Sequence, residues 1–157
     1  IITIANICGN RYMENLDETK SISNIPKKMN YDQIIQVGDL LITMTGNVGR
    51  TSFSNSKNCL LNQRVCKILT TNSFDKELVY QLTKTSKFQN TMEIQSAGIA
   101  QKNISKSAIY NFKFDSSSCN KRNVQTLAMI DSKIEILNLI ESNIKSLKQY
   151  LLSTLFI

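Results

Sequence analysis

Apolar residues in the first half of the chain occur in short runs that are broken by glycine and polar turns, a pattern typical of β-strands. Four such runs, rich in β-branched or aromatic residues, span residues 34–37, 40–45, 50–54 and 64–69. Between them stand Gly38-Asp39, Gly46-Asn47-Val48-Gly49 and a polar turn at 55–58. Because such turns join neighbouring strands, we predict a twisted, mostly antiparallel sheet. Residues 1–7 form a further strand candidate, and residues 8–30 read as a polar surface loop.

The apolar spacing becomes helical from Asp75 onward. An acidic first turn precedes apolar residues at broadly helical spacings up to Met92, and Gly98 ends the pattern. A polar loop follows, and residues 108–114 resemble a final strand with Ile109, Phe112 and Phe114 available for the core.

Residues 121–156 contain neither glycine nor proline, and their apolar residues recur every three or four positions. This spacing predicts one helix about 50 Å long with an apolar side. A soluble helix of this kind packs against a partner, and the phase of the stripe favours a short coiled coil over a regular zipper. The predicted dimer or partner interface consists of Leu127, Ile130, Ile134, Leu137, Ile140, Ile144, Leu147, Leu151 and Leu155.

These elements predict a mixed α/β chain of the α+β type. We expect a recognition domain at residues 1–114, a linker at 115–120 and a helical spacer or dimerisation helix at 121–157. The chain of 157 residues is long enough for one such domain and its appendage.

The net charge of +7 favours a polyanionic partner. The excess is greatest in residues 61–115, where eight Lys and Arg residues face four Asp and Glu residues (+4). Because no long basic run exists, a DNA-binding face has to be assembled by folding.

Catalytic motifs are missing from the sequence. Without histidine there is no Ser-His-Asp or Cys-His arrangement, and the glycines at 46 and 49 are too close for a nucleotide phosphate loop. The single Pro26, followed by Lys27, also excludes the Asp-Pro-Pro-Tyr type loop of amino-methylating enzymes and a Pro-Asp nuclease start. We expect no enzymatic activity of the chain itself.

The four cysteines form no Cys-x-x-Cys pair, so we expect reduced thiols, no metal site and a cytoplasmic location. No secretory signal and no apolar run long enough to span a membrane is present in the sequence, so no membrane partner is expected.

Amide and basic side chains in the turns and loops are the candidate DNA contacts. Asn and Gln pair with adenine edges, and Arg pairs with guanine or phosphate. The alternative for residues 62–64 is that they cap and space the neighbouring strand, and the alternative for the 46–49 turn is a β-turn that requires positive φ. The candidates are Lys27, Lys28, Asn47, Arg50, Asn62, Gln63, Arg64, Gln101, Lys102 and Asn103.

Four sequence segments occur in an order that resembles a known family. They are Gly38-Asp39-Leu40-Leu41-Ile42-Thr43 with Thr45-Gly46-Asn47-Val48-Gly49-Arg50, Leu61-Asn62-Gln63-Arg64-Val65, Gly98-Ile99-Ala100-Gln101-Lys102-Asn103-Ile104-Ser105, and the helix end Ser146-Leu147-Lys148-Gln149-Tyr150-Leu151-Leu152. Together they resemble the DNA-specificity (S) subunit of type I restriction-modification systems.

The resemblance implies a non-catalytic subunit whose target recognition domain reads one half of a split site in double-stranded DNA. It also implies helical spacers that pair with each other and hold methyltransferase (modification) subunits. S-adenosylmethionine, ATP and Mg are then expected only on partner subunits. A full S subunit has two recognition domains, so this chain is expected to be either a half-size subunit acting as a homodimer or the C-terminal half of a longer one.

Two other functions remain open on the sequence. One is a DNA- or RNA-binding regulator that dimerises through its C-terminal helix without a methyltransferase partner. The other, disfavoured by the missing motifs, is a fragment of a nuclease or methyltransferase.

Overall fold

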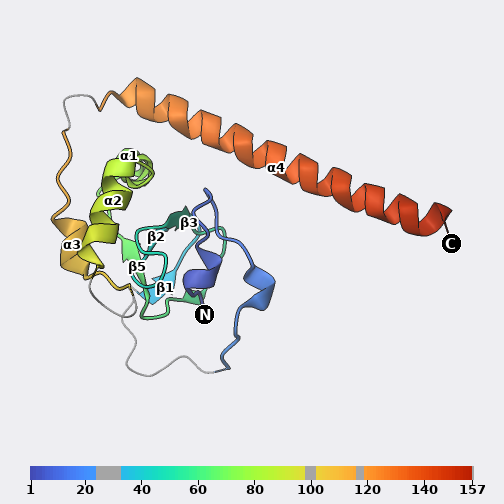
Figure 1. The fold of residues 1–157 in the computed structure, drawn as a ribbon, viewed down its shortest axis with the longest axis horizontal. Coiled ribbons are helices and arrows are strands. Elements are labelled where there is room, and N and C mark those ends of the chain that lie inside the picture. Colours follow the sequence, from blue (N-terminus) through green and yellow to red (C-terminus); the bar gives the residue numbers. More distant parts are fainter. Residues whose placement is uncertain (24–32, 98–101, 116–118, 157) are drawn as a thin grey trace. The chain divides into compact units, whose positions relative to one another are not determined.

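The computed structural model describes residues 1–23, 33–97, 102–115 and 119–156 (Figure 1). The chain divides into two compact units, Ile1–Asn120 and Lys121–Ile157. In its described residues the first unit contains small, mainly antiparallel sheets and short helices, and the second is one long helix. This α+β architecture confirms the predicted fold class.

The sheets are formed by short strands, most of which lie inside the predicted runs. β2 is the centre of a three-stranded antiparallel sheet with the order β3-β2-β5, and β1 pairs with β4. The strands are β1 (Ile34–Ile35), β2 (Leu40–Thr43), β3 (Thr51–Phe53), β4 (Cys59–Leu60) and β5 (Val65–Ile68). Only β4 lies outside the predicted runs.

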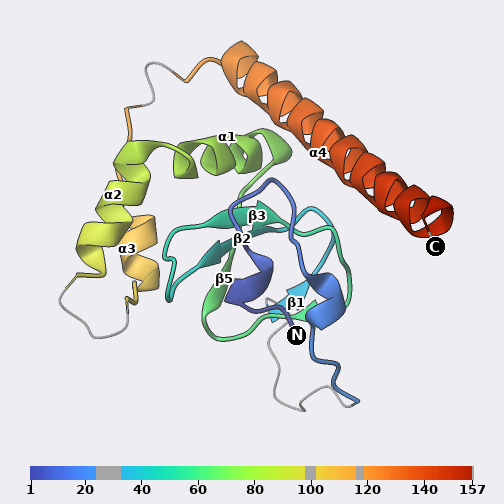
Figure 2. The same ribbon diagram turned by 45° about the vertical axis from the view of Figure 1, so that its right-hand side comes forward.

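Strand β2 is covered on both faces. Leu40, Leu41 and Ile42 have no exposed surface, as the uninterrupted apolar run requires. Leu41 belongs to a cluster with the N-terminal segment, whereas Ile42 packs with Phe88 and Met92 on the helical side. Figures 1 and 2 show the three short α-helices gathered on one side of this sheet.

The N-terminal segment differs from its prediction. Residues 1–7 do not form a strand, because Thr3 and Asn6 form a capping box around the 3₁₀-helix η1 (Ile4–Asn6). The Asn6 amide donates to the carbonyls of Glu14 and Asn15 at 3.1 and 3.0 Å, which fixes the following chain against this turn.

The predicted surface loop at 8–30 is also partly wrong. Residues 11–13 run beside β3: the Phe53 N–H donates to the Arg11 carbonyl at 2.7 Å, and the Met13 N–H donates to the Phe53 carbonyl at 3.1 Å. Met13 is buried. A second 3₁₀-helix, η2 (Leu16–Glu18), follows, and residues 24–32 lie outside the described ranges.

Arg11 connects residues 11–13 to helix α1 (Ser73–Thr83) through its side chain. Its guanidinium donates to both carboxylate oxygens of Glu77, at 3.0 and 2.7 Å, and lies 4.9 Å from the Phe53 ring centroid and 5.4 Å from that of Tyr80. These hydrogen bonds to Glu77 raise the pKa of Arg11 further above its ordinary value, so the guanidinium stays charged.

We expect Arg11→Met to destabilise the first unit by about 2 to 4 kcal/mol, because the mostly buried Glu77 carboxylate loses its cation. Urea unfolding of the full chain measures the loss. The double variant Arg11→Met/Glu77→Gln should recover part of it, since no buried charge then lacks a counterion. A double variant as unstable as Arg11→Met alone would mean that Arg11 contributes packing rather than charge.

The helical region after Asp75 consists of two helices where the sequence suggested one pattern. In α1 the Asn72 side chain accepts from the Asp75 N–H at 2.9 Å, and in α2 (Ser86–Gln95) the Thr85 hydroxyl accepts from the Phe88 N–H at 3.3 Å. Thr85 therefore caps a second helix and divides the pattern.

The strand predicted at 108–114 is wrong. Residues Lys106–Tyr110 form helix α3, because the Ser105 hydroxyl accepts from the Ala108 N–H at 3.2 Å and caps the first turn. The expected core role of Phe112 holds in part, since its ring packs edge-on against Phe88 with centroids 4.9 Å apart. Phe114 is 41% exposed.

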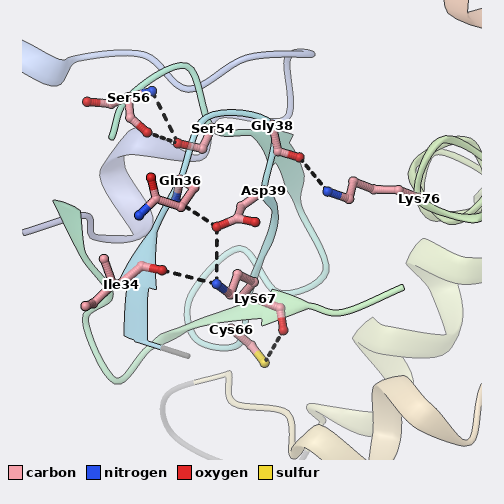
Figure 3. A network of polar contacts seen from close by, with 9 residues as sticks. All are labelled: Ile34, Gln36, Gly38, Asp39, Ser54, Ser56, Cys66, Lys67 and Lys76. Carbon is pink, nitrogen blue, oxygen red and sulfur yellow. Dashed lines mark hydrogen bonds and ion pairs between the residues drawn. The ribbon is translucent and has the colours of Figure 1, made fainter. Parts of the chain in front are cut away.

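The Gly38-Asp39 turn joins the two sheets to each other and to α1 (Figure 3). The Asp39 carboxylate accepts from the Gln36 N–H at 2.8 Å and from Lys67 Nζ at 3.2 Å, and Lys67 also donates to the Ile34 carbonyl at 3.1 Å. Lys76 of α1 donates to the Gly38 carbonyl at 2.9 Å. These contacts give this conspicuous motif a structural role.

The second unit is helix α4 (Lys121–Leu155), close to the predicted bounds. All nine residues of the predicted interface stripe have exposed side chains, between 44% and 69%. None of the described helices is sufficiently long and apolar to cross a membrane.

Candidate nucleic-acid interface

Three polar segments far apart in the sequence meet where β2 ends. The Met44 N–H donates to the Arg64 carbonyl at 2.9 Å, and the Met44 carbonyl accepts from the Ile104 N–H at 2.8 Å. One step further, the Gly46 N–H donates to the Lys102 carbonyl at 2.9 Å. Main-chain bonds to the end of one strand therefore hold together the 46–50 turn, the 62–64 segment and the 102–103 segment, which we call the recognition end.

The 46–49 turn is fixed from inside by Thr43, which is 1% exposed. Its hydroxyl donates to the Asn47 carbonyl at 2.5 Å and accepts from the Arg50 N–H at 3.1 Å. Gly46 and Gly49 adopt φ of 75° and 79°, which confirms a turn that requires positive φ. The side chains of Asn47 and Arg50 are exposed, so the turn presents an amide and a guanidinium to solvent.

The 62–64 segment divides into one structural residue and two exposed ones. The Asn62 side-chain oxygen accepts from the Arg64 N–H at 3.0 Å, and the Asn62 main-chain carbonyl accepts from the Val65 N–H at 3.0 Å, which forms the turn into β5. Across the described ranges, the exposed side chains of Gln63 and Arg64 form no hydrogen bond or ion pair.

The 102–103 segment is tied to the same end by side chains. The Thr45 hydroxyl donates to Asn103 Oδ1 at 3.0 Å, so the Asn103 amide keeps its N–H donors for another partner. Lys102 Nζ lies 3.6 Å from a carboxylate oxygen of Glu93, and both side chains are more than half exposed. Such a surface pair is weak and is readily exchanged for a phosphate.

Three further predicted DNA contacts lie outside the described residues: Lys27, Lys28 and Gln101. The described candidates are brought to one end of the sheet, and whether they contact DNA stays a prediction.

Sequence reasoning missed Lys106 and Tyr110, which lie beside Gln63 along a groove described below. The assignment of 108–114 as a strand hid Tyr110 and left Lys106 in the segment before it. The Ser105-x-x-Ala108 spacing, with a hydroxyl ahead of a helix-forming residue, is the signal that could have revealed them.

Among the residues that the structure describes, no group of three or more Cys, Asp or Glu side chains is placed to hold a metal ion. Burial raises the pKa of the Cys66 thiol, against a smaller opposing effect of Lys106, so this thiol is protonated at neutral pH. What the recognition end offers is hydrogen-bond donors, acceptors and positive charge.

Comparisons with known proteins give a match in structure alone. No family model matches the chain, and no curated protein matches it in sequence. A solved structure does match: the S subunit of a type I restriction-modification system from M. genitalium, with a TM-score of 0.56 and 20% sequence identity. The match covers 98% of this chain and 44% of that structure, so the chain spans less than half of its length.

This likeness places the chain in a structural class. Over nearly its whole length the chain has the fold seen in that type I S subunit, and the resemblance expected from the four sequence segments is thereby confirmed at the level of fold.

Proposed function

We propose that the chain is the DNA-recognition part of a type I restriction-modification complex. The exposed side chains of the recognition end read one half of a bipartite site in double-stranded DNA. Helix α4 docks methyltransferase subunits and pairs with the α4 of a second copy or with the other half of a longer S subunit. The chain itself is non-catalytic, and S-adenosylmethionine, ATP and Mg bind to partner subunits.

The observation that supports this function most is the convergence of amide and basic side chains at one end of a sheet, in a fold shared with an S subunit over 98% of the chain. Phosphate contacts position a protein on DNA and base contacts give it specificity, and the recognition end supplies both kinds of group. The net charge of +7 favours the same partner.

The direct test is co-expression of the full chain with the methyltransferase subunits of its own host. We expect the chain to co-purify with them and methylated adenines to appear at one split sequence. DNA binding by a dimer that captures no methyltransferase would support the regulator instead. Methylation that does not depend on the chain would contradict the proposal.

Amide and charge removal at the recognition end should have different effects on the reconstituted complex. Gln63→Ala should weaken binding to a duplex that carries the split target sequence by about 1 to 3 kcal/mol, and should change binding to mixed-sequence DNA little. Lys102→Ala should weaken binding to both duplexes and reduce the magnitude of the negative slope of log K against log salt by about 0.9. Titration of both duplexes at several salt concentrations measures these effects. Equal losses for Gln63→Ala on the two duplexes would exclude Gln63 from base reading.

A further inference from the structure

A groove of about 370 Å³ opens next to the recognition end. It lies between residues 61–63, which lead into β5, and helix α3. Its lining includes Met44, Gln63, Lys106 and Tyr110. The main chain of Met44 is hydrogen-bonded to the main chains of both Arg64 and Ile104, so the groove is continuous with the recognition end.

Helix α3 is built to present two of its side chains to this groove. Ala108 is buried and Ile109 packs against the same core, which anchors the helix to the sheet. Lys106 and Tyr110 stand one turn apart and therefore share the opposite, solvent-facing side. Both are exposed, and the Tyr110 side chain is 76% exposed. A large aromatic side chain with this exposure contributes little to the core.

The charge along the groove is positive. Lys67 also lines it but is neutralised by Asp39, at 3.2 Å, and is mostly buried. For Lys106 the described residues provide no ion pair, and none of the described side chains along the groove is a carboxylate. Lys106 therefore supplies the uncompensated positive charge, with a phenol and the Gln63 amide beside it.

An ammonium, a phenol and an amide are all side-chain groups that contact DNA phosphates, and an exposed tyrosine ring offers an apolar face to a deoxyribose. We propose that this groove holds the sugar-phosphate backbone of the strand next to the bases at the recognition end. Lys106 contacts a phosphate, and Tyr110 packs against the adjoining sugar. This inference rests on the proposed function and extends its contact surface to α3.

The test compares Lys106→Gln with Lys57→Gln in the full chain, assembled with its methyltransferase and titrated with a mixed-sequence duplex. Both changes remove one exposed positive charge, but Lys57 follows β3 and therefore lies at the other end of the antiparallel sheet from the 46–49 turn. We expect Lys106→Gln to reduce the magnitude of the slope of log K against log salt by about 0.9. Over a fourfold rise in salt, the unchanged complex should then lose about 3.5-fold more affinity than the variant. Lys57→Gln should leave the slope unchanged.

Tyr110 is tested in the same titration. Tyr110→Ala should weaken binding to all duplexes without changing the salt slope, because an uncharged contact releases no counterion. A second readout uses the unchanged chain: duplex DNA should protect the Lys106 amine from acylation and leave Lys57 reactive.

Two outcomes overturn the inference separately from the proposed function. Equal slopes for Lys106→Gln and Lys57→Gln, with specific methylation intact, reject the groove alone. Loss of methyltransferase capture by Lys106→Gln, with its salt slope unchanged, assigns the groove to a protein partner. A complex that neither methylates nor binds DNA refutes both proposals.

Discussion

The double variant Ile140→Glu/Ile144→Glu is expected to sediment as a monomer at concentrations where the unchanged chain is a dimer. These side chains are 47% and 61% exposed on α4, in an apolar stripe of the kind that soluble proteins rarely leave uncovered. Fully burying an isoleucine contributes about 1.5 to 3 kcal/mol, and a dimer contains four of these side chains, each about half exposed before pairing. Losing all four therefore weakens association about a hundredfold to ten-thousandfold. Analytical ultracentrifugation of the two chains measures this change.

Ser142→Glu/Ser146→Glu is the matched control, since it adds the same charge at the same spacing on the opposite side of α4. It should remain a dimer and keep its methyltransferase. If both double variants dissociate, net charge and not the stripe governs assembly. If the unchanged chain is itself a monomer at every concentration, α4 serves only a different partner.

Gly49→Ala is expected to destabilise the first unit by about 2 to 5 kcal/mol. Its φ of 79° is unfavourable for any residue with a side chain, which costs about 1 to 2 kcal/mol. An added methyl group would also lie 3.1 Å from Met92 Cγ and 3.3 Å from a Phe88 ring carbon, inside the packed interface with α2. Overpacking of this kind costs about 1 to 3 kcal/mol more.

Gly38→Ala separates these two contributions. Gly38 has a similar φ of 82°, but an added methyl group there meets no atom within 4 Å. It should therefore cost only the backbone strain, about 1 to 2 kcal/mol. Urea unfolding midpoints compare the two variants. Equal midpoints would show that Met92 and Phe88 shift aside without cost.

The sequence predicts four of the five described strands, the turn at Gly46 and Gly49 and the long helix because their signals are local. Alternating apolar runs, glycines that permit positive φ and the absence of helix breakers act within a few residues. The class of fold follows from these elements.

Some errors come from local caps that went unrecognised, at Thr3 and at Ser105, and others occur where distant residues decide the structure. Residues 11–13 read as a polar loop, yet Arg11 is held by Glu77, which stands 66 positions away. Likewise, the sequence gives no sign that the side-chain carbonyl of Asn103, a predicted DNA contact, accepts from the hydroxyl of Thr45, 58 positions earlier. Nothing in the local pattern indicates either partner, so sequence alone could not separate the structural amides from the exposed ones.

The recognition end is held together by main-chain bonds and by the side chains of Thr43, Thr45, Asn62 and Asn103. The outward side chains of Asn47, Gln63 and Arg64 contribute almost nothing to that framework. Under the proposed function, such a protein can acquire new DNA targets by mutation at a low risk of unfolding, because the positions proposed to choose the sequence are separate from those that maintain the fold. The same separation makes the exposed positions suitable for a randomised library in which folding is kept constant and only target preference is selected.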